Sequence, residues 1–349
     1  MNSRTIDPTS AFCDIPKFRP HALLRNGHLQ TIVGAYWWGP VPPYCAARHE
    51  ALLADGDRIL LHDDRPETWS LGDPAVLLLH GLSGSHASPY VARTADKLRL
   101  RGIRTFRMDL RGCGAGARLA RGPLHAGRSE DAAAALTTVA AVCPGSPVFV
   151  IGFSMGGNII LKMVGEMGDA APSYLRAIIA VAPPIDLAAT CRNLASGVNT
   201  IYDRRFVRSL LLQLENRRCE LPDAYHRELT RRPRTVYEFD DWVTAPLAGF
   251  ADADDYYQQA SSGPLLARVR VPTLILAAAD DPLVPATIFQ CYTYSDAVRL
   301  HITEGGGHVG YIGAAGDDPD RRWMEWRIVE QITWLAKQQE SLSLALHRT

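Results

Sequence analysis

The chain has 349 residues, of which 47% are hydrophobic and 21% are charged, and this is the composition of an ordinary globular protein. Its 37 Lys and Arg residues balance its 37 Asp and Glu residues, whereas nucleic-acid and anionic-membrane partners favour a basic excess. No apolar run approaches the roughly 20 residues that span a bilayer, and residues 1–18 lack the apolar segment of a secretory signal. We therefore expect a cytoplasmic protein with no transmembrane segment and no nucleic-acid partner.

Proline and aromatic residues are frequent in residues 1–50, which are expected to form an arm packed on a folded core. Asp55-Gly56 then separates two short apolar stretches within residues 52–63, a pattern that predicts a β-hairpin. Apolar runs and helix-forming segments alternate after this point. Strands are predicted over residues 75–79, 105–110, 147–153 and 175–182, and helices over residues 89–100, 129–142 and 155–167. This alternation is typical of a parallel sheet with helices on both faces.

The alternation stops at Pro184, and residues 185–262 are predicted to be an inserted helical cap that contains the Arg-rich stretch Arg204–Gln213. After the insertion, strands are predicted over residues 271–279 and 298–303, and a closing helix is predicted over residues 317–339. The side chains expected to face inward from that helix are Trp323, Trp326, Ile328, Ile332, Trp334 and Leu335. We therefore predict a doubly wound, mostly parallel α/β core built from residues 51–184 and 263–349.

The segment Gly152-Phe153-Ser154-Met155-Gly156 fits the pattern Gly-x-Ser-x-Gly. A buried strand is predicted before it and a helix after it, so the chain turns sharply at Ser154. Small flanking residues are needed because the neighbouring elements crowd this strained turn. The hydroxyl group of Ser154 then stands above the sheet at the start of a helix, and we predict that it is a nucleophile.

A serine hydroxyl group is a poor nucleophile at neutral pH, so it needs a nearby base that is itself oriented by an acid. The histidines that follow Ser154 are His226, His301, His308 and His347. His308 lies in a glycine-rich loop after the last predicted strand, from which a base can reach over the sheet edge. The other three fall in the insertion, in a strand and in the tail, so we predict that His308 is the base.

The acid is expected in the loop after the strand at residues 271–279, because the order along the chain is serine, acid, histidine. Two adjacent carboxylates, Asp280 and Asp281, occupy this loop. We select Asp281 because it stands four residues before Pro285, which is the usual spacing of the acid from the second proline of this loop. Asp280 stays open as an alternative, and so does Asp186, which follows an earlier strand.

Attack on a carbonyl group places negative charge on its oxygen, and backbone N–H donors are needed to stabilise that charge. One predicted donor is Met155, the residue after the nucleophile. The other is Leu82, in the loop His80–Ser85 that follows an early strand. The sequence therefore predicts an oxyanion hole made from two backbone N–H groups.

The sequence indicates neither a metal nor a cofactor. The seven cysteines are widely spaced and form no Cys-x-x-Cys pair, and His80, His86 and His125 have no carboxylate at metal-ligand spacing. The glycine-rich stretch 112–116 is not followed by the Gly-Lys-Ser/Thr of a phosphate-binding loop. Arginines of the insertion are expected on a solvated helix face, although a peripheral contact with anionic lipid headgroups stays open. These arginines are Arg204, Arg205, Arg208, Arg231, Arg232 and Arg234.

The most specific segments are Asn26–Ile32 and, in the insertion, Phe239–Asp241, Thr244–Pro246, Gly249–Phe250 and Tyr256–Tyr257. Together with His80–Ser85, Asp109–Gly114, Gly152–Asn158 and Gly306–Gly310, they resemble the YheT-like branch of the α/β-hydrolase superfamily, also described as AB hydrolase family 4. The resemblance implies the α/β-hydrolase fold and carboxylic-ester hydrolysis, with eukaryotic relatives that act on acylglycerols or phospholipids. It maps the family's serine, aspartate and histidine onto Ser154, Asp281 and His308. His28 is expected to help dock the N-terminal arm on the core.

The sequence thus predicts a serine hydrolase that cleaves a short- to medium-chain acyl ester, or an acylglycerol-like ester, through an acyl-serine intermediate. Acyl transfer or thioester cleavage by the same three residues is the alternative reading, since only the acceptor in the second half-reaction or the leaving group differs. A protein that keeps the fold but only binds its ligand is a third and more remote reading.

Overall fold

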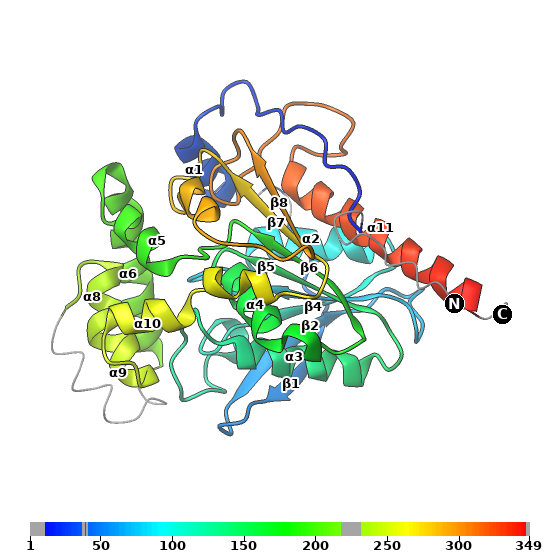
Figure 1. Ribbon diagram of the computed structural model, residues 1–349, viewed down its shortest axis with the longest axis horizontal. Coiled ribbons are helices and arrows are strands. Elements are labelled where there is room, and N and C mark those ends of the chain that lie inside the picture. The colour runs from blue at the N-terminus through cyan, green and yellow to red at the C-terminus, as the bar shows by residue number, and fades with distance from the viewer. Residues whose placement is uncertain (1–10, 37–38, 40, 218–231, 347–349) are drawn as a thin grey trace.

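A sheet of eight strands forms the centre of the protein, in the order β1-β2-β4-β3-β5-β6-β7-β8 (Figure 1). The computed structural model describes residues 11–36, 39, 41–217 and 232–346. Antiparallel pairing joins β1 to β2 and β2 to β4, and the remaining neighbours are parallel. The strands are β1 (Ala47–Leu52), β2 (Arg58–Asp64), β3 (Ala75–Leu79), β4 (Arg104–Asp109), β5 (Val148–Phe153), β6 (Leu175–Val181), β7 (Thr273–Ala278) and β8 (Val298–Thr303).

Helices cover both faces of this sheet, with α2 and α11 on one face and α3 and α4 on the other (Figure 1). Strand β5 shows why two layers are needed. Val148 and Val150 pack in the core under α3 and α4, whereas Phe149 and Ile151 pack in the core under α2 and α11. A strand that is buried on both faces is apolar throughout, as β5 is. The helices of these layers are α2 (Pro89–Arg99), α3 (Ser129–Val142), α4 (Met155–Met167) and α11 (Trp323–Leu346).

A helical segment separates β6 from β7 in the chain and gathers at one end of the sheet (Figure 1). Its elements are α5 (Leu187–Leu194), α6 (Thr200–Asn216), α8 (Val236–Phe239), a π-helical turn (Asp240–Thr244), α9 (Ala245–Ala248) and α10 (Ala253–Ala260). Helix α1 (Gly27–Tyr36) packs against the loops that follow β7 and β8 (Figure 1). No helix among the described residues is both long enough and apolar enough to cross a bilayer.

The predicted doubly wound, mostly parallel sheet with a helical insertion is confirmed, and the predicted strands and helices of the core agree with the structure to within a few residues at most ends. The closing helix is an exception, because it begins at Trp323 and not at residue 317. Trp334 was expected to face inward, but it is 43% exposed. It lies two positions after the buried Ile332, and two helical steps rotate a side chain by roughly 200° to the opposite side. His226, His347 and Arg231, weighed from the sequence, lie outside the described residues.

Candidate active site

The structure brings Ser154, His308 and Asp281 together at the carboxyl edge of the sheet. Ser154 lies between β5 and α4, Asp281 follows β7, and His308 follows β8. The Nδ1 atom of His308 lies 2.8 Å from an Asp281 carboxylate oxygen, and the Nε2 atom lies 2.8 Å from the Ser154 hydroxyl oxygen. Because the carboxylate can only accept, Nδ1 carries the proton and Nε2 is left to accept the proton of the hydroxyl group.

Ser154 sits in a strained turn, as the sequence pattern predicts. Its φ is 51°, in the left-handed region that residues with a Cβ atom rarely adopt. The turn is fixed by a hydrogen bond of 2.8 Å from the Ser154 N–H to the Val181 carbonyl oxygen. A Cβ atom at Gly156 would lie 2.6 Å from the carbonyl oxygen of His80, so only glycine fits there. The crowding explains why small residues flank the serine.

Of the three aspartates considered from the sequence, Asp281 is the one that hydrogen-bonds to the side chain of His308. Its second oxygen accepts hydrogen bonds from the N–H groups of Leu283 and Val284, at 2.8 and 3.0 Å, which hold the carboxylate in place. Asp280 instead accepts a hydrogen bond of 2.8 Å from the Gly307 N–H, so it supports the main chain next to the histidine. Asp186 caps α5 and accepts a hydrogen bond from the Tyr292 hydroxyl group.

The predicted backbone donors, Leu82 and Met155, line the same cavity as Ser154 and His308. Met155 is the first residue of α4, so its N–H group has no acceptor within the helix. The loop of Leu82 is shaped by His80, whose Nδ1 atom donates to the Gly81 carbonyl at 2.7 Å and whose Nε2 atom accepts from the Leu110 N–H at 3.1 Å. Complete burial lowers the pKa of His80, so the ring stays neutral and keeps these two hydrogen bonds.

Helix α1 supports the loop of His308 from the other side, and this role was missed from the sequence. The His308 N–H donates to the Thr31 hydroxyl oxygen at 2.8 Å, and that hydroxyl group donates to the Gly27 carbonyl at 2.7 Å. Gln30 accepts from the Ile312 N–H at 2.7 Å and donates to the Ile312 carbonyl at 3.1 Å. The segment Asn26–Ile32 is specific in sequence, but its contacts with a distant loop do not follow from the spacing of its residues.

His28 makes a different contact from its neighbours in α1. Its Nδ1 atom lies 3.0 Å from the hydroxyl group of Tyr202 in α6, and the two rings are stacked with an interplanar angle of 6°. His28 therefore docks α1 on the inserted helices rather than on the sheet.

The family model of the alpha/beta hydrolase fold matches residues 74–315 of this chain. The chain belongs to the α/β-hydrolase family. It is 30% identical over 338 residues to the Escherichia coli protein YheT, and the alignment covers 95% of this chain and 98% of that protein. The resemblance to the YheT-like branch is therefore confirmed.

A second relative of this α/β-hydrolase is a yeast protein, the medium-chain fatty acid ethyl ester synthase/esterase 2 of Saccharomyces cerevisiae. The two are 25% identical over 303 residues, which cover 79% of this chain and 65% of the yeast protein. Among solved structures, an esterase of Pyrococcus furiosus is similar with a TM-score of 0.52 and 15% identity, covering 93% of this chain and 100% of that chain. At this identity the structural similarity shows the fold alone.

Two cavities of the α/β-hydrolase meet at Ser154 and His308. The first, which we call the inner cavity, has a volume of about 110 Å³ and is walled by α5, α6, α8, the π-helical turn and α10. The second, which we call the outer cavity, has a volume of about 680 Å³ and lies between α1 and the start of α6. Its rim includes the exposed side chains of Ile32, Val198 and Ile201. Both cavities are mainly apolar, so the site is suited to apolar groups on either side of the serine.

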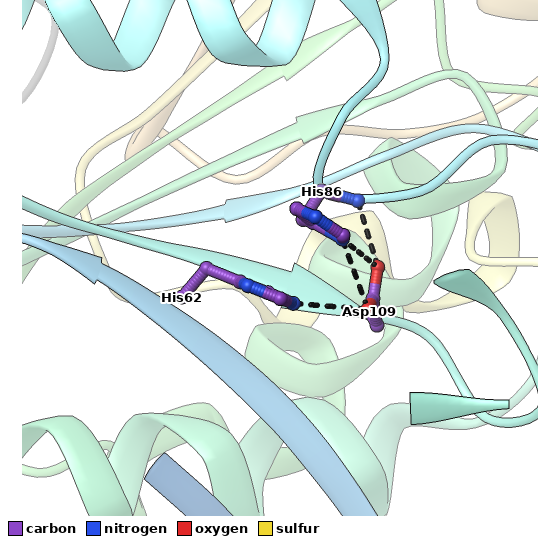
Figure 2. A group of neighbouring side chains, drawn as sticks. All are labelled: His62, His86 and Asp109. Atoms are coloured by element: carbon purple, nitrogen blue, oxygen red, sulfur yellow. Dashed lines mark hydrogen bonds and ion pairs between the residues drawn. The ribbon is translucent and has the colours of Figure 1, made fainter. Parts of the chain in front are cut away.

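A second cluster of polar side chains joins His62 and His86 to Asp109 (Figure 2). His62 donates to Asp109 at 3.0 Å, and both the ring and the main-chain N–H of His86 donate to Asp109 at 2.8 to 2.9 Å. Burial would raise the pKa of Asp109, but these hydrogen bonds hold it well below its usual range. Sequence spacing did not reveal this cluster, because folding brings Asp109 next to His86 from 23 positions away in the chain.

The geometry of this cluster favours hydrogen bonding over metal binding. The rings of His62 and His86 are stacked with their centres 3.5 Å apart and an interplanar angle of 12°. An imidazole binds a cation in the plane of its ring, so one ion cannot lie in both planes. Asp109 also accepts a hydrogen bond of 2.8 Å from the Ala115 N–H. We therefore assign the cluster a structural role, in which it fixes the end of the loop that carries Leu82.

Proposed function

We propose that this α/β-hydrolase is a serine esterase that cleaves carboxylic esters through an acyl-serine intermediate. The observation that carries the proposal is the continuous hydrogen-bonded series from Ser154 through His308 to Asp281, with both distances at 2.8 Å. The yeast relative named as a synthase/esterase gives independent support, because its name describes chemistry at the same kind of bond. In this proposal Ser154 is the nucleophile, His308 the general base and Asp281 the orienting acid.

The proposed reaction begins when the Ser154 oxygen attacks the ester carbonyl carbon while His308 takes the hydroxyl proton. The N–H groups of Leu82 and Met155 then stabilise the negative charge on the carbonyl oxygen. Collapse of this intermediate breaks the bond to the alcohol, which leaves with the proton from His308. A water molecule, activated by His308, releases the acid and restores Ser154.

The sizes of the two cavities suggest the kind of ester. A dry cavity of roughly 150 Å³ holds a benzene molecule, and the inner cavity, at about 110 Å³, is somewhat smaller. It therefore suits a chain of no more than about six carbon atoms, whereas the outer cavity leaves room for a larger apolar group. We propose an ester with one short and one longer apolar part, within the predicted range of short- to medium-chain and acylglycerol-like esters.

The arrangement of the chain belongs to the same proposal. We propose that residues 185–262 act as a cap over Ser154, since α5, α6, α8 and α10 wall the inner cavity. Residues 1–50 would act as an arm, whose α1 docks on the loop of His308, although their last residues enter β1. A cytoplasmic location stays a prediction, and fractionation of cells that express the protein would test it.

Acyl transfer is the second candidate function, and the name of the yeast relative favours it because it pairs a synthase with an esterase. The first half-reaction would be the same, but an alcohol would enter in place of water in the second. Adding ethanol to the assay separates the two functions. A transferase would form the ethyl ester in preference to the free acid, whereas an esterase would release mainly the acid.

The test combines a fluorophosphonate probe with short-chain p-nitrophenyl esters. The probe is expected to label the protein, and Ser154→Ala is expected to lose both the labelling and the turnover while it unfolds at the same temperature. Ser196→Ala, at an exposed serine of the same chain, serves as the matched control and should keep both. A well-folded protein that takes up no probe and turns over no ester would refute the proposed function and favour a binding protein.

A further inference from the structure

The wall of the inner cavity contains a buried carboxyl group that the proposed reaction does not use. Asp240 begins the π-helical turn Asp240–Thr244, lines the inner cavity and is 8% exposed. One carboxylate oxygen accepts a hydrogen bond of 2.7 Å from the Thr244 hydroxyl group, and the other accepts one of 2.7 Å from the Tyr257 hydroxyl group. These three residues come from the cap segments that the sequence marks as specific. Turns of the π type occur often at functional sites.

The hydrogen-bonding capacity of Asp240 is only partly used by the protein. An ionised carboxylate offers about four acceptor positions, and two hydroxyl groups occupy one position on each oxygen. The Tyr257 hydroxyl group also contacts the Cys191 sulfur atom at 3.2 Å, so it is not fully committed to Asp240. Asp240 makes no ion pair within the described parts of the chain. Burial raises the pKa of Asp240 to about 6, which leaves the group largely ionised at neutral pH.

His125, on the same cavity wall, has a ring nitrogen with no hydrogen-bond partner among the residues that the structure describes. The Nδ1 atom of His125 accepts a hydrogen bond of 3.2 Å from the Gly127 N–H. Burial lowers the pKa of His125 to about 3, so the ring is neutral and its proton lies on Nε2. This donor has no acceptor among the described residues, although His125 as a whole is only 9% exposed. The mainly apolar lining of the inner cavity therefore includes a carboxylate and a neutral imidazole away from Ser154.

We propose that the inner cavity binds a chain that carries a hydroxyl group, and that this hydroxyl group donates its hydrogen bond to Asp240. The inference rests on the proposed function and narrows it to hydroxylated esters. A plain alkyl chain would cover the carboxylate and remove its remaining hydration without offering a donor, which is unfavourable. A hydroxyl group supplies the missing donor at small size. An ammonium group fits less well, because it has three N–H donors, whereas Asp240 is the one carboxylate among the residues that line the inner cavity.

A purely structural role for Asp240 is the competing explanation, since it also ties the π-helical turn to α10 through Tyr257. The two explanations differ in what they predict for ligand choice. A structural residue would affect the binding of plain and hydroxylated chains equally. A recognition residue would change the ratio of the two dissociation constants. General damage to the protein would weaken the binding of both ligands alike, so this ratio would stay the same.

The experiment measures binding to Ser154→Ala, which should not cleave its ligands. Dissociation constants are determined by NMR titration for ethyl hexanoate against ethyl ω-hydroxyhexanoate, and for hexyl acetate against ω-hydroxyhexyl acetate, so that either side of the ester can enter the inner cavity. The double variants Ser154→Ala/Asp240→Asn and Ser154→Ala/Asp254→Asn are compared. Asp254 is an exposed residue of α10 outside the cavity lining, and it loses the same charge.

The hydroxylated ester of one pair is expected to bind about tenfold or more tightly, as a hydrogen bond to a charged group allows. Asp240→Asn should reduce this ratio to within about threefold, and Asp254→Asn should leave it unchanged. Equal binding within both pairs, or a preference that survives Asp240→Asn, would overturn the inference. Failure of the proposed function would appear separately, as wild-type protein that binds these esters without cleaving them.

Discussion

Replacing Thr31 with valine removes a hydroxyl group that holds the main chain of His308. Valine has almost the same shape, so the packing of α1 on the sheet should survive. The His308 N–H loses its acceptor at 2.8 Å, and the Gly27 carbonyl loses its donor at 2.7 Å. Thr31 is 7% exposed, so water has little access to replace either hydrogen bond. The change therefore acts on the position of the proposed base and leaves Ser154 untouched.

The expected loss follows from the cost of an unsatisfied buried donor, about 1 to 3 kcal/mol. Since roughly 1.4 kcal/mol corresponds to a factor of ten in rate, kcat should fall about tenfold to a hundredfold if the loop of His308 relieves that cost by moving. The KM for a short ester should change little, because Thr31 does not reach the inner cavity and valine keeps the volume of threonine where it lines the outer cavity. A stability loss of similar size is also expected in chemical denaturation.

The assay compares kcat and KM for a p-nitrophenyl ester between wild type, Thr31→Val, Thr31→Ser and Thr137→Val. Thr31→Ser keeps the hydroxyl group and should restore most of the activity. Thr137 lies in α3 and donates to a carbonyl one turn back at 2.9 Å, as Thr31 does, but it contacts no part of the site. Thr137→Val should therefore retain full activity. A Thr31→Val protein with kcat within about twofold of wild type would show that the Thr31 hydroxyl group does not position His308.

Two further predictions concern carboxyl groups. Asp281→Asn should lower kcat by about 10,000-fold, because an amide no longer stabilises the charged imidazole and favours the wrong ring tautomer, whereas Asp280→Asn keeps an acceptor for Gly307 and should lose less than about tenfold. Steady-state kinetics decide this, and equal losses would contradict the assignment. Burial raises the pKa of Asp240 from 3.8 to about 6, so the folded protein binds a proton that the unfolded chain has already released. Stability should therefore fall by roughly 3 kcal/mol as the pH rises through that window. In urea denaturation, Asp240→Asn should reduce the fall in the free energy of unfolding with rising pH. An equal fall in the wild type and in Asp240→Asn would contradict this prediction.

Much of the fold could be predicted from the sequence because its strongest signals are local. The apolar run of β5 and the glycine turn that follows it define a buried strand ending at Ser154, and the structure has both. The periodicity of α11 was less decisive, since Trp334 is apolar but lies on the opposite side from Ile332. Hydrophobicity therefore located the elements better than it assigned their faces.

Helix α1 was not predicted, and its glycines are the reason. Glycine is a poor helix former, so the sequence GHLQTIVGAY does not indicate a helix from propensity. The structure explains the choice, because a Cβ atom at Gly34 would lie 2.6 Å from the Cα atom of Gly310. Close approach of α1 to the loop of His308 requires glycine at this position. The contact between α1 and this loop therefore requires a residue with low helix propensity, so the sequence of α1 does not predict a helix.

The parts of the site that the sequence did not reveal all depend on contacts between distant segments. Ser154, Asp281 and His308 each follow a strand, so their meeting follows from the topology of a parallel sheet. The neighbours of Asp109 and Asp240 do not follow from it, because they depend on side-chain packing. His62 reaches Asp109 from the adjacent strand β2, His86 reaches it from a loop, and Tyr257 reaches Asp240 from an inserted helix. Such contacts become visible only when the side chains are placed.

The hydrogen bond between Thr31 and His308 joins residues that are 277 positions apart. Helix α1 docks on the loops that follow β7 and β8, so its partner is in place only after these strands have paired. A chain whose sheet has already formed would therefore still hold the His308 loop unsupported until α1 docks. During refolding, activity should then recover after the spectroscopic signals of the sheet and helices, so that turnover reports the last step of maturation.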